Sequence, residues 1–148
     1  MYTKIVVPLD GSERAEAILP HVESQAKAYG ASVIFLQVIE LDRTLRSPHA
    51  TDVAVEKAVE RIEEQEDEAT AYLSALVKDF KGKGIEADYL VEQGTIVERI
   101  IRVAEREDAD LIAIASHGRT GLPRVFYGSV AAGILQRVDR PLLLIRSR

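Results

Sequence analysis

Short runs of aliphatic and β-branched residues recur along the chain, and most are followed by a longer segment whose apolar residues have helical spacing. The runs predict five strands, at residues 4–9, 33–39, 85–91, 111–115 and 141–145, of which the third alternates like a half-buried edge strand. The patterns between them predict four helices, at residues 12–29, 52–80, 95–107 and 129–138. Strands that alternate with helices form a parallel sheet, because each parallel connection needs a crossover that covers a face. The sequence therefore predicts an α/β fold with a five-stranded parallel sheet and helices on both faces.

The size and composition fit a single domain that spans residues 1–148. The chain has 47% hydrophobic and 29% charged residues, which is enough apolar material for a sizeable core. No apolar stretch approaches the roughly 18–20 residues of a membrane span. The first predicted strand begins directly after Thr3, without a preceding signal peptide. We therefore expect a soluble, cytoplasmic protein that does not bind membranes.

Several chemistries are disfavoured by what the sequence lacks. Without cysteine the chain forms no disulfide, thiolate nucleophile or thiolate-bound metal centre. The net charge of −5 argues against a protein that coats nucleic acid. The signatures G-x-x-x-x-G-K-[ST], G-x-G-x-x-G, G-x-S-x-G and H-E-x-x-H are all absent. His21, His49 and His117 lie far apart in the sequence, which disfavours a metal site built from all three.

The long helical pattern at residues 52–80 carries one apolar stripe. Its positions follow steps of three and four and are interrupted by a single glutamate: Val55, Val59, Ile62, Glu66, Ala69, Leu73, Leu76 and Phe80. Packing of this stripe on the sheet is the favoured interpretation, and binding of a partner helix is the alternative. The acidic run at residues 63–68 fits a solvated helix face better than a metal site.

An open parallel sheet binds ligands beyond the carboxyl ends of its strands, where the winding reverses direction. The chemistry is therefore expected near Asp10, near Val38 and after Ala115, which all stand at the ends of predicted strands. Two roles remain open at the first of these positions. The Asp10 carboxylate can accept hydrogen bonds from ribose hydroxyls, or Asp10 or Ser12 can cap the first helix.

The segment from Ala115 to Val130 is the best candidate for anion binding. It runs from the end of a strand to the start of a helix, where free backbone N–H groups and the helix dipole favour phosphate. Gly118 and Gly128 let the backbone approach a ligand closely or take a positive φ. The Ser129 hydroxyl can either cap this helix or donate to a phosphate oxygen.

Charge also favours an anionic ligand in this part of the chain. Residues 117–148 contain six Arg and one acidic residue, so this segment carries +5 and, with −5 overall, the first 116 residues carry −10. Arg119 and Arg124 lie in the predicted loop and are the candidate phosphate neighbours. Arg140, Arg146 and Arg148 are interpreted as solubilising residues.

These residues resemble the universal stress protein family over essentially the whole chain. The first predicted strand ends in Pro8–Ser12 (P-L-D-G-S), which is similar to the family's P-x-D-x-S pattern. Members that bind ATP carry G-x-x-G-x9-G-[ST] after the fourth strand. Here Gly118, nine residues and then Gly128 and Ser129 have this spacing. The resemblance implies a Rossmann-like fold, similar to adenine nucleotide α-hydrolases, with strand order 3-2-1-4-5 and two helices on each face.

The resemblance also implies a site for ATP, which would carry its own Mg²⁺ or Mn²⁺, since the protein alone supplies no metal site. Asp10 would hold the ribose and Val38 would border the adenine, while residues 116–119 and 128–130 would surround the phosphates. His117, in an S-H-G tripeptide, is expected to order the loop rather than to catalyse. The implied ATP-binding residues are Pro8, Asp10, Val38, Ile114, Ala115, Ser116, His117, Gly118, Arg119, Gly128, Ser129 and Val130.

The sequence departs from the family motif at Ala115, where the motif has its first glycine. A methyl group there can crowd a nucleotide if the backbone approaches it closely or needs a positive φ. Because alanine has the smallest side chain, we expect weakened rather than abolished binding.

The last predicted strand holds four consecutive apolar residues that the family order places at an edge of the sheet: Leu142, Leu143, Leu144 and Ile145. An apolar edge is prone to aggregation unless another strand covers it. Members of the family commonly dimerise through this strand. We therefore expect a homodimer formed by this edge.

Three functions are compatible with the sequence. The favoured one is a non-enzymatic regulatory protein of the stress response that binds adenine nucleotide, a second copy of itself and regulatory partners that the sequence does not identify. A slow ATPase is disfavoured, because the chain has no Walker lysine and no obvious pair of acidic Mg²⁺ ligands. The third is an interaction module without nucleotide binding. Ala115 supports it, and its contact surface would be residues 41–51 and the long helix.

Overall fold

The computed structural model describes residues 1–41, 43–117 and 128–147. Its strands are β1 (Lys4–Pro8), β2 (Ser32–Ile39), β3 (Ala87–Gln93), β4 (Leu111–His117) and β5 (Leu142–Ser147). They form a sheet of order β3-β2-β1-β4-β5 in which every neighbouring pair is parallel. The predicted fold class and strand order are thereby confirmed, and the winding reverses between β1 and β4.

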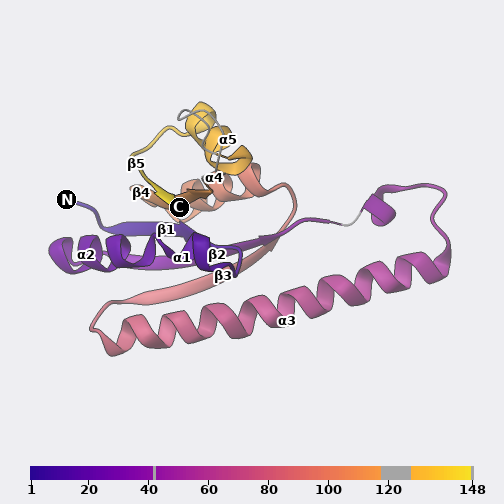
Figure 1. Ribbon diagram of the computed structural model, residues 1–148, viewed down its shortest axis with the longest axis horizontal. Helices are drawn as coiled ribbons and strands as arrows, with labels where there is room; N and C mark the ends of the chain where they lie inside the picture. Colours follow the sequence, from indigo (N-terminus) through magenta and orange to yellow (C-terminus); the bar gives the residue numbers. More distant parts are fainter. Residues whose placement is uncertain (42, 118–127, 148) are drawn as a thin grey trace.

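The helices form a layer on each face of the sheet. They are α1 (Glu13–Glu16), α2 (Leu19–Tyr29), α3 (Asp52–Gly82), α4 (Ile96–Arg106) and α5 (Ser129–Arg137), with a 3-10 helix, η1 (Arg43–Arg46). Figure 1 shows α4 and α5 on one side of the sheet, with α2 and α3 on the other. Alternate strand residues therefore enter different cores. Val33 and Phe35 pack on the α2–α3 side, whereas Ile34 and Leu36 pack on the α4–α5 side.

The first predicted helix, at residues 12–29, is divided into two in the structure. Ser12 caps α1, because its hydroxyl accepts a hydrogen bond of 3.2 Å from the backbone N–H of Ala15. Pro20 then lies in the first turn of α2. Proline has no N–H, and in a continuous helix its ring would clash with the carbonyl of Glu16. The proline therefore ends one helix and starts the next.

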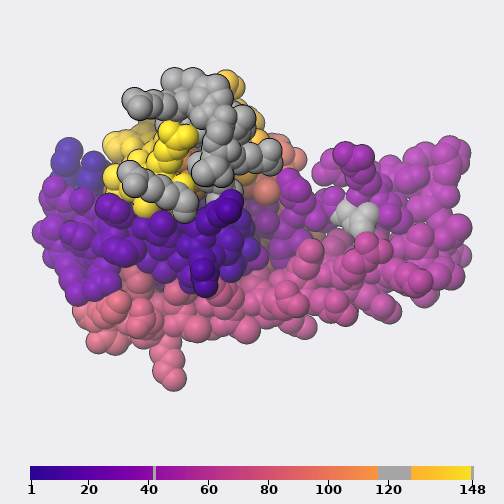
Figure 2. Space-filling view, in the orientation of Figure 1, coloured from indigo at the N-terminus to yellow at the C-terminus, as the bar shows by residue number. Residues whose placement is uncertain are grey.

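Helix α3 is longer than the sheet that it covers. Its 31 residues extend about 46 Å at 1.5 Å per residue, whereas the eight residues of β2 extend about 26 Å. Its N-terminal part and η1 project beyond the sheet as an arm (Figures 1 and 2). Ile62 and Leu73 of the predicted stripe are buried, but Val59 in the arm is 41% exposed. The expected packing on the sheet therefore applies only to the C-terminal part of the stripe.

Arg140 corrects another expectation, since it is a structural residue rather than a solubilising one. Its side chain is only 17% exposed. One guanidinium nitrogen, Nη1, donates to the carbonyl oxygens of Ala104 at 2.9 Å and Ala109 at 2.7 Å. These carbonyls belong to the end of α4 and the turn before β4. Arg140 therefore joins the end of α4 to the turn before β4, and it gives the Ala104 carbonyl a second donor beside the N–H of Ala109.

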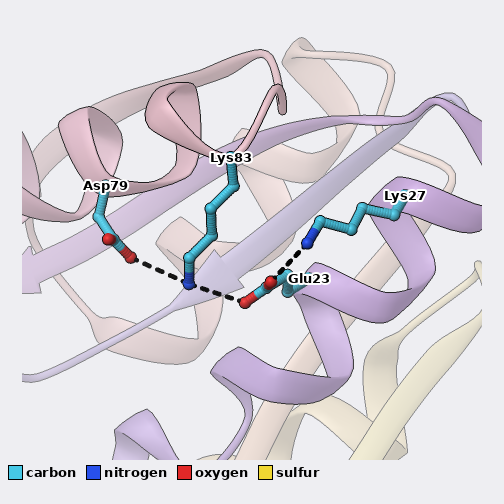
Figure 3. Close-up of polar contacts among 4 residues, drawn as sticks. All are labelled: Glu23, Lys27, Asp79 and Lys83. Atoms are coloured by element: carbon cyan, nitrogen blue, oxygen red, sulfur yellow. Dashed lines mark hydrogen bonds and ion pairs between the residues drawn. The ribbon is translucent and has the colours of Figure 1, made fainter.

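A network of surface ion pairs connects α2 to the end of α3 (Figure 3). Lys83 Nζ lies 2.9 Å from Glu23 Oε2 and 3.3 Å from Asp79 Oδ2, and Lys27 Nζ lies 2.7 Å from Glu23 Oε1. Hydrogen bonds from Lys27 and Lys83 hold the pKa of Glu23 below its ordinary value, and those to Glu23 and Asp79 raise the pKa of Lys83. Because these groups are solvated and screened, the ion pairs add little to the stability of the fold.

Asp110 connects the start of β1 to the start of β4. Its Oδ1 accepts hydrogen bonds from the backbone N–H groups of Thr3 at 3.1 Å and Lys4 at 3.0 Å. Its Oδ2 accepts from the N–H of Thr3 at 2.8 Å and from the Thr3 hydroxyl at 3.0 Å. Burial alone would raise the pKa of Asp110, but these hydrogen bonds outweigh it and lower the pKa. The folded state therefore favours the ionised carboxylate.

Replacing Asp110 with asparagine is expected to lower the free energy of unfolding at pH 7 by about 1–2 kcal/mol. Because the folded-state pKa is lowered, this contribution is complete above about pH 4, the ordinary value for aspartate. It is lost as the pH falls through the lowered folded-state pKa. Urea unfolding at neutral and acidic pH measures this, and the stabilities of the two proteins should converge in acid. Asp108→Asn is the control, because Asp108 is exposed and has φ 53°, which asparagine tolerates. Equal stability of wild type and D110N at pH 7 would contradict the assignment.

Candidate functional site

A cavity opens at the carboxyl ends of β1 and β4, where the strand order reverses. It encloses about 670 Å³ of empty space, including its open mouth. The lining residues come from both helical layers and from β1, β2 and β4: Pro8, Leu9, Asp10, Ala15, Leu36, Val38, Ile96, Ile100, Ile114, Ala115, Ser116, Gly128, Ser129, Val130 and Ala131.

Nine of the twelve residues named from the sequence line this cavity. They are Pro8, Asp10, Val38, Ile114, Ala115, Ser116, Gly128, Ser129 and Val130. His117 is the last residue of β4, and its side chain lies outside what the structure describes. Gly118, Arg119 and Arg124 also lie outside the described residues. The structure thus brings together segments that are more than 100 residues apart in the sequence.

The remaining lining residues were not foreseen from the sequence as part of a site. All of them are apolar: Leu9, Ala15, Leu36, Ile96, Ile100 and Ala131. A signal existed for some of them. Leu36 is two residues before Val38 on β2, so both side chains lie on the same face. Ile96 and Ile100 are four residues apart on α4 and share one helix face.

The turn after β1 shows which of the two residues, Asp10 or Ser12, caps the first helix. Ser12 is the cap of α1, and Asp10 is not. Asp10 Oδ1 instead accepts a hydrogen bond of 2.9 Å from the backbone N–H of Ser12. Gly11 between them has φ 84°, a conformation that glycine adopts without strain. This turn holds an exposed carboxylate at the cavity wall.

Ser116 places a polar group deep in the cavity. The residue is 2% exposed, and its Oγ has no hydrogen-bond partner among the residues that the structure describes. Leaving a buried hydroxyl unpaired costs about 1–3 kcal/mol, so most such groups in proteins have a partner. A ligand in the cavity would supply one.

The start of α5 forms the opposite wall. Gly128 is its N-cap residue, with φ 79° and ψ 157°, and among the residues that the structure describes no side chain caps the helix. Ser129 is the first helical residue, so capping is not its role here. The first N–H groups of a helix have no partner within the helix, and they attract anions. The cavity thus has an anion-attracting wall and, at Leu36, Ile96 and Ile100, an apolar wall.

Ala115 does not need the conformational freedom of glycine. Among the described residues other than glycine, only Asp108 has a positive φ. Ala115 is 8% exposed and belongs to the core cluster that contains Ala15. The methyl group therefore causes no backbone strain. Its effect on ligand binding depends on the space that it occupies in the cavity.

Within residues 1–41, 43–117 and 128–147, no group of three or more His, Asp or Glu side chains is placed to hold a metal ion. None of the helices in this described part is both long enough and apolar enough to span a membrane.

Comparisons with known proteins agree with this architecture. The model of the universal stress protein family matches residues 1–146. Universal stress protein MJ0577 from Methanocaldococcus jannaschii is 28% identical, and the alignment covers 100% of this chain and 97% of the relative. The solved structure of MJ0577 superimposes with a TM-score of 0.84 over 100% of this chain and 98% of that one.

A second solved structure, the universal stress protein from Archaeoglobus fulgidus in complex with dAMP, has the same fold. It is 22% identical and superimposes with a TM-score of 0.68 over 97% of this chain and 98% of that one. The family match includes β1 to β4, β5 up to Arg146 and every lining residue of the cavity. On this evidence the chain belongs to the universal stress protein family.

Proposed function

We propose that the chain binds ATP in the cavity between β1 and β4 and acts as a non-enzymatic regulatory protein. The cavity combines two environments that an adenine nucleotide needs. Its apolar wall, with Leu36, Val38 and Ile100, suits a purine ring. Its polar side, with Asp10 and the start of α5, suits ribose hydroxyls and phosphates. Mg²⁺ or Mn²⁺ would enter with the nucleotide.

The observation that carries the proposal is the hydroxyl of Ser116, which has no hydrogen-bond partner within residues 1–41, 43–117 and 128–147. A buried polar atom without a partner is costly, and Ser116 lines a cavity whose wall also includes a helix N-terminus. A phosphate group would accept a hydrogen bond from this hydroxyl and from the N–H groups near Ser129 at the same time. The Archaeoglobus protein solved with dAMP supports adenine nucleotide as the ligand class for this fold.

Nucleotide analysis of freshly purified, acid-extracted protein tests the proposal, together with melting curves with and without Mg-ATP. A ligand at 100 times its Kd stabilises the folded state by about 2.7 kcal/mol. For a chain of about 150 residues this raises Tm by on the order of 5–10 °C. Near-stoichiometric adenine nucleotide or such a shift is the expected result. An empty protein with an unchanged Tm at millimolar Mg-ATP would overturn it and favour the interaction module.

We further propose that the protein is a homodimer through β5. This strand pairs with β4 and occupies one end of the sheet. Its apolar residues, Leu142 to Ile145, are each only half-buried in the protomer. An edge of this kind can pair with another strand. A second copy related by a two-fold axis would cover both edges at once.

The mass in solution tests the dimer. Static light scattering at micromolar concentration is expected to give twice the protomer mass of 16.4 kDa. Leu144→Lys should shift the mass to that of the protomer, because it places like charges in the proposed interface. Leu90→Lys is the matched control, since Leu90 is also half-buried on the α4–α5 side but lies on the other edge strand, β3. A monomeric mass for the wild-type protein would contradict the proposal.

A further inference from the structure

One hydrogen bond joins α3 to α1, the short helix that follows Asp10, although the partners lie far apart in the sequence. The Tyr72 hydroxyl on α3 donates to Glu16 Oε1 at 3.1 Å, across a separation of 56 residues. Glu16 is the last residue of α1. Neither Tyr72 nor Glu16 lines the cavity, so a direct role in ligand contact does not account for this pair.

From Glu16 the hydrogen bonds continue to Asp10. The backbone N–H of Glu16 donates to the carbonyl oxygen of Ser12 at 3.3 Å. The N–H of Ser12 in turn donates to Asp10 Oδ1 at 2.9 Å. Ala15, which lines the cavity, is held in the same turn by the Ser12 hydroxyl at 3.2 Å. An unbroken series of contacts therefore connects the Tyr72 phenol to the cavity carboxylate.

Helix α1 needs support from outside itself. It has only four residues, and a helix of this length is unstable alone because nucleation is unfavourable. Pro20 prevents it from continuing into α2. The contact with α3 is thus a restraint that local sequence does not provide.

The phenol of Tyr72 remains a donor throughout the physiological pH range. Burial, the hydrogen bond to Glu16 and the negative charges of Glu16 and Asp10 all raise the pKa of Tyr72 well above its ordinary value. The hydroxyl therefore keeps its proton, and Glu16 remains the acceptor.

We propose that Tyr72 is a positioning residue for the nucleotide site: by anchoring Glu16 to α3, it fixes α1 and so holds the Asp10 carboxylate where a ribose hydroxyl is recognised. This inference rests on the proposed binding of adenine nucleotide. It adds a residue outside the cavity that sets how well the cavity distinguishes ribose from deoxyribose.

Calorimetric titration of four proteins with Mg-ATP and with the 2′-deoxy and 3′-deoxy analogues tests this proposal. Tyr72→Phe is expected to weaken ATP binding by about three- to tenfold, the range for one lost hydrogen bond. The deoxy analogue that lacks the hydroxyl contacted by Asp10 should bind Tyr72→Phe as tightly as it binds the wild type. The ratio of the affinity for ATP to the affinity for this analogue should therefore be smaller in the variant. Glu16→Gln should keep the preference, because the amide oxygen still accepts from the phenol. Tyr89→Phe on β3 is the control for losing a hydroxyl elsewhere.

A double mutant separates positioning from general damage. In an Asp10→Ala background, Tyr72→Phe should have no further effect on ATP affinity, because the group that it positions is gone. Equal weakening of ATP and both deoxy analogues, or the same loss in the Asp10→Ala background, would overturn the proposal.

Amide hydrogen exchange of the nucleotide-free protein gives a readout that does not depend on binding. Tyr72→Phe should accelerate exchange at the N–H groups of Ser12 and Glu16 by severalfold, but not at Val22 in α2. Unchanged exchange at Ser12 and Glu16 would overturn the positioning role even if nucleotide binds. If the wild type binds no adenine nucleotide while exchange responds as expected, the proposed function fails and the anchoring of α1 by Tyr72 stands.

Discussion

Replacing Gly128 with valine is expected to reduce the affinity for Mg-ATP by roughly 100-fold or more. Gly128 has φ 79° and ψ 157°, a region that residues other than glycine essentially do not occupy. Forcing a side chain into it costs about 1–3 kcal/mol, or about 5–150-fold in an equilibrium constant, and a β-branched residue is at the upper end. Relief of this strain would move the start of α5, whose N–H groups the phosphates need. Calorimetric titration measures the loss.

Gly84→Val is the matched control for this prediction. Gly84 has φ 81°, and a side chain there would meet nothing within 4 Å. It lies in the turn before β3 and does not line the cavity. We expect similar backbone strain and a similar loss of stability, but an unchanged Kd for Mg-ATP. If G84V lost as much affinity as G128V, or if G128V bound like the wild type, the role of the α5 start would be refuted.

Replacing Phe35 with alanine is expected to lower the free energy of unfolding by about 3–5 kcal/mol, the usual cost of removing a buried phenylalanine. Phe35 is fully buried on β2, in the core between the sheet and the α2–α3 layer. Its ring meets Phe80 of α3 edge to face, with the ring centroids 4.9 Å apart. The variant would lose both the buried area and this aromatic pair. Urea unfolding measures the change, with Tm falling by on the order of 10 °C.

Two further variants serve as controls for this prediction. Phe35→Leu keeps most of the volume and should cost clearly less than Phe35→Ala. Leu135→Ala also truncates a large apolar side chain, on α5, but Leu135 is 45% exposed and the change should stay within about 0.5 kcal/mol. A Phe35→Ala variant as stable as Leu135→Ala would mean that the packing around β2 is not as described.

Much of the fold could be predicted because it depends on local patterns. The apolar runs marked all five strands, and their alternation with helices indicated a parallel sheet. The order of the strands came from the family resemblance, since spacing does not determine which strands become neighbours. The break between α1 and α2 could have been read from Pro20. The projection of α3 could have been read from its length, because no strand matches a 31-residue helix.

The candidate site was predictable to the extent that it lies at strand ends. Asp10, Ser116 and Gly128 were identified because residues beyond the carboxyl ends of parallel strands meet at the point of reversal. Arg140 and Tyr72 were not identified, because each acts through partners more than 30 residues away. Such contacts depend on how the helices pack against the sheet, and the residue pattern of one sequence does not indicate them.

The arm of α3 has a hydrodynamic consequence. The chain exposes 8980 Å² of surface, whereas a compact monomer of 16.4 kDa is expected to expose about 7,500 Å². A particle with a projecting helix experiences more friction than a sphere of equal mass (Figure 2). A lone protomer should therefore diffuse slowly and elute early from a gel-filtration column, at the volume of a heavier sphere. Elution volume would mimic dimerisation, whereas scattering intensity and sedimentation equilibrium depend on mass and would distinguish the two states.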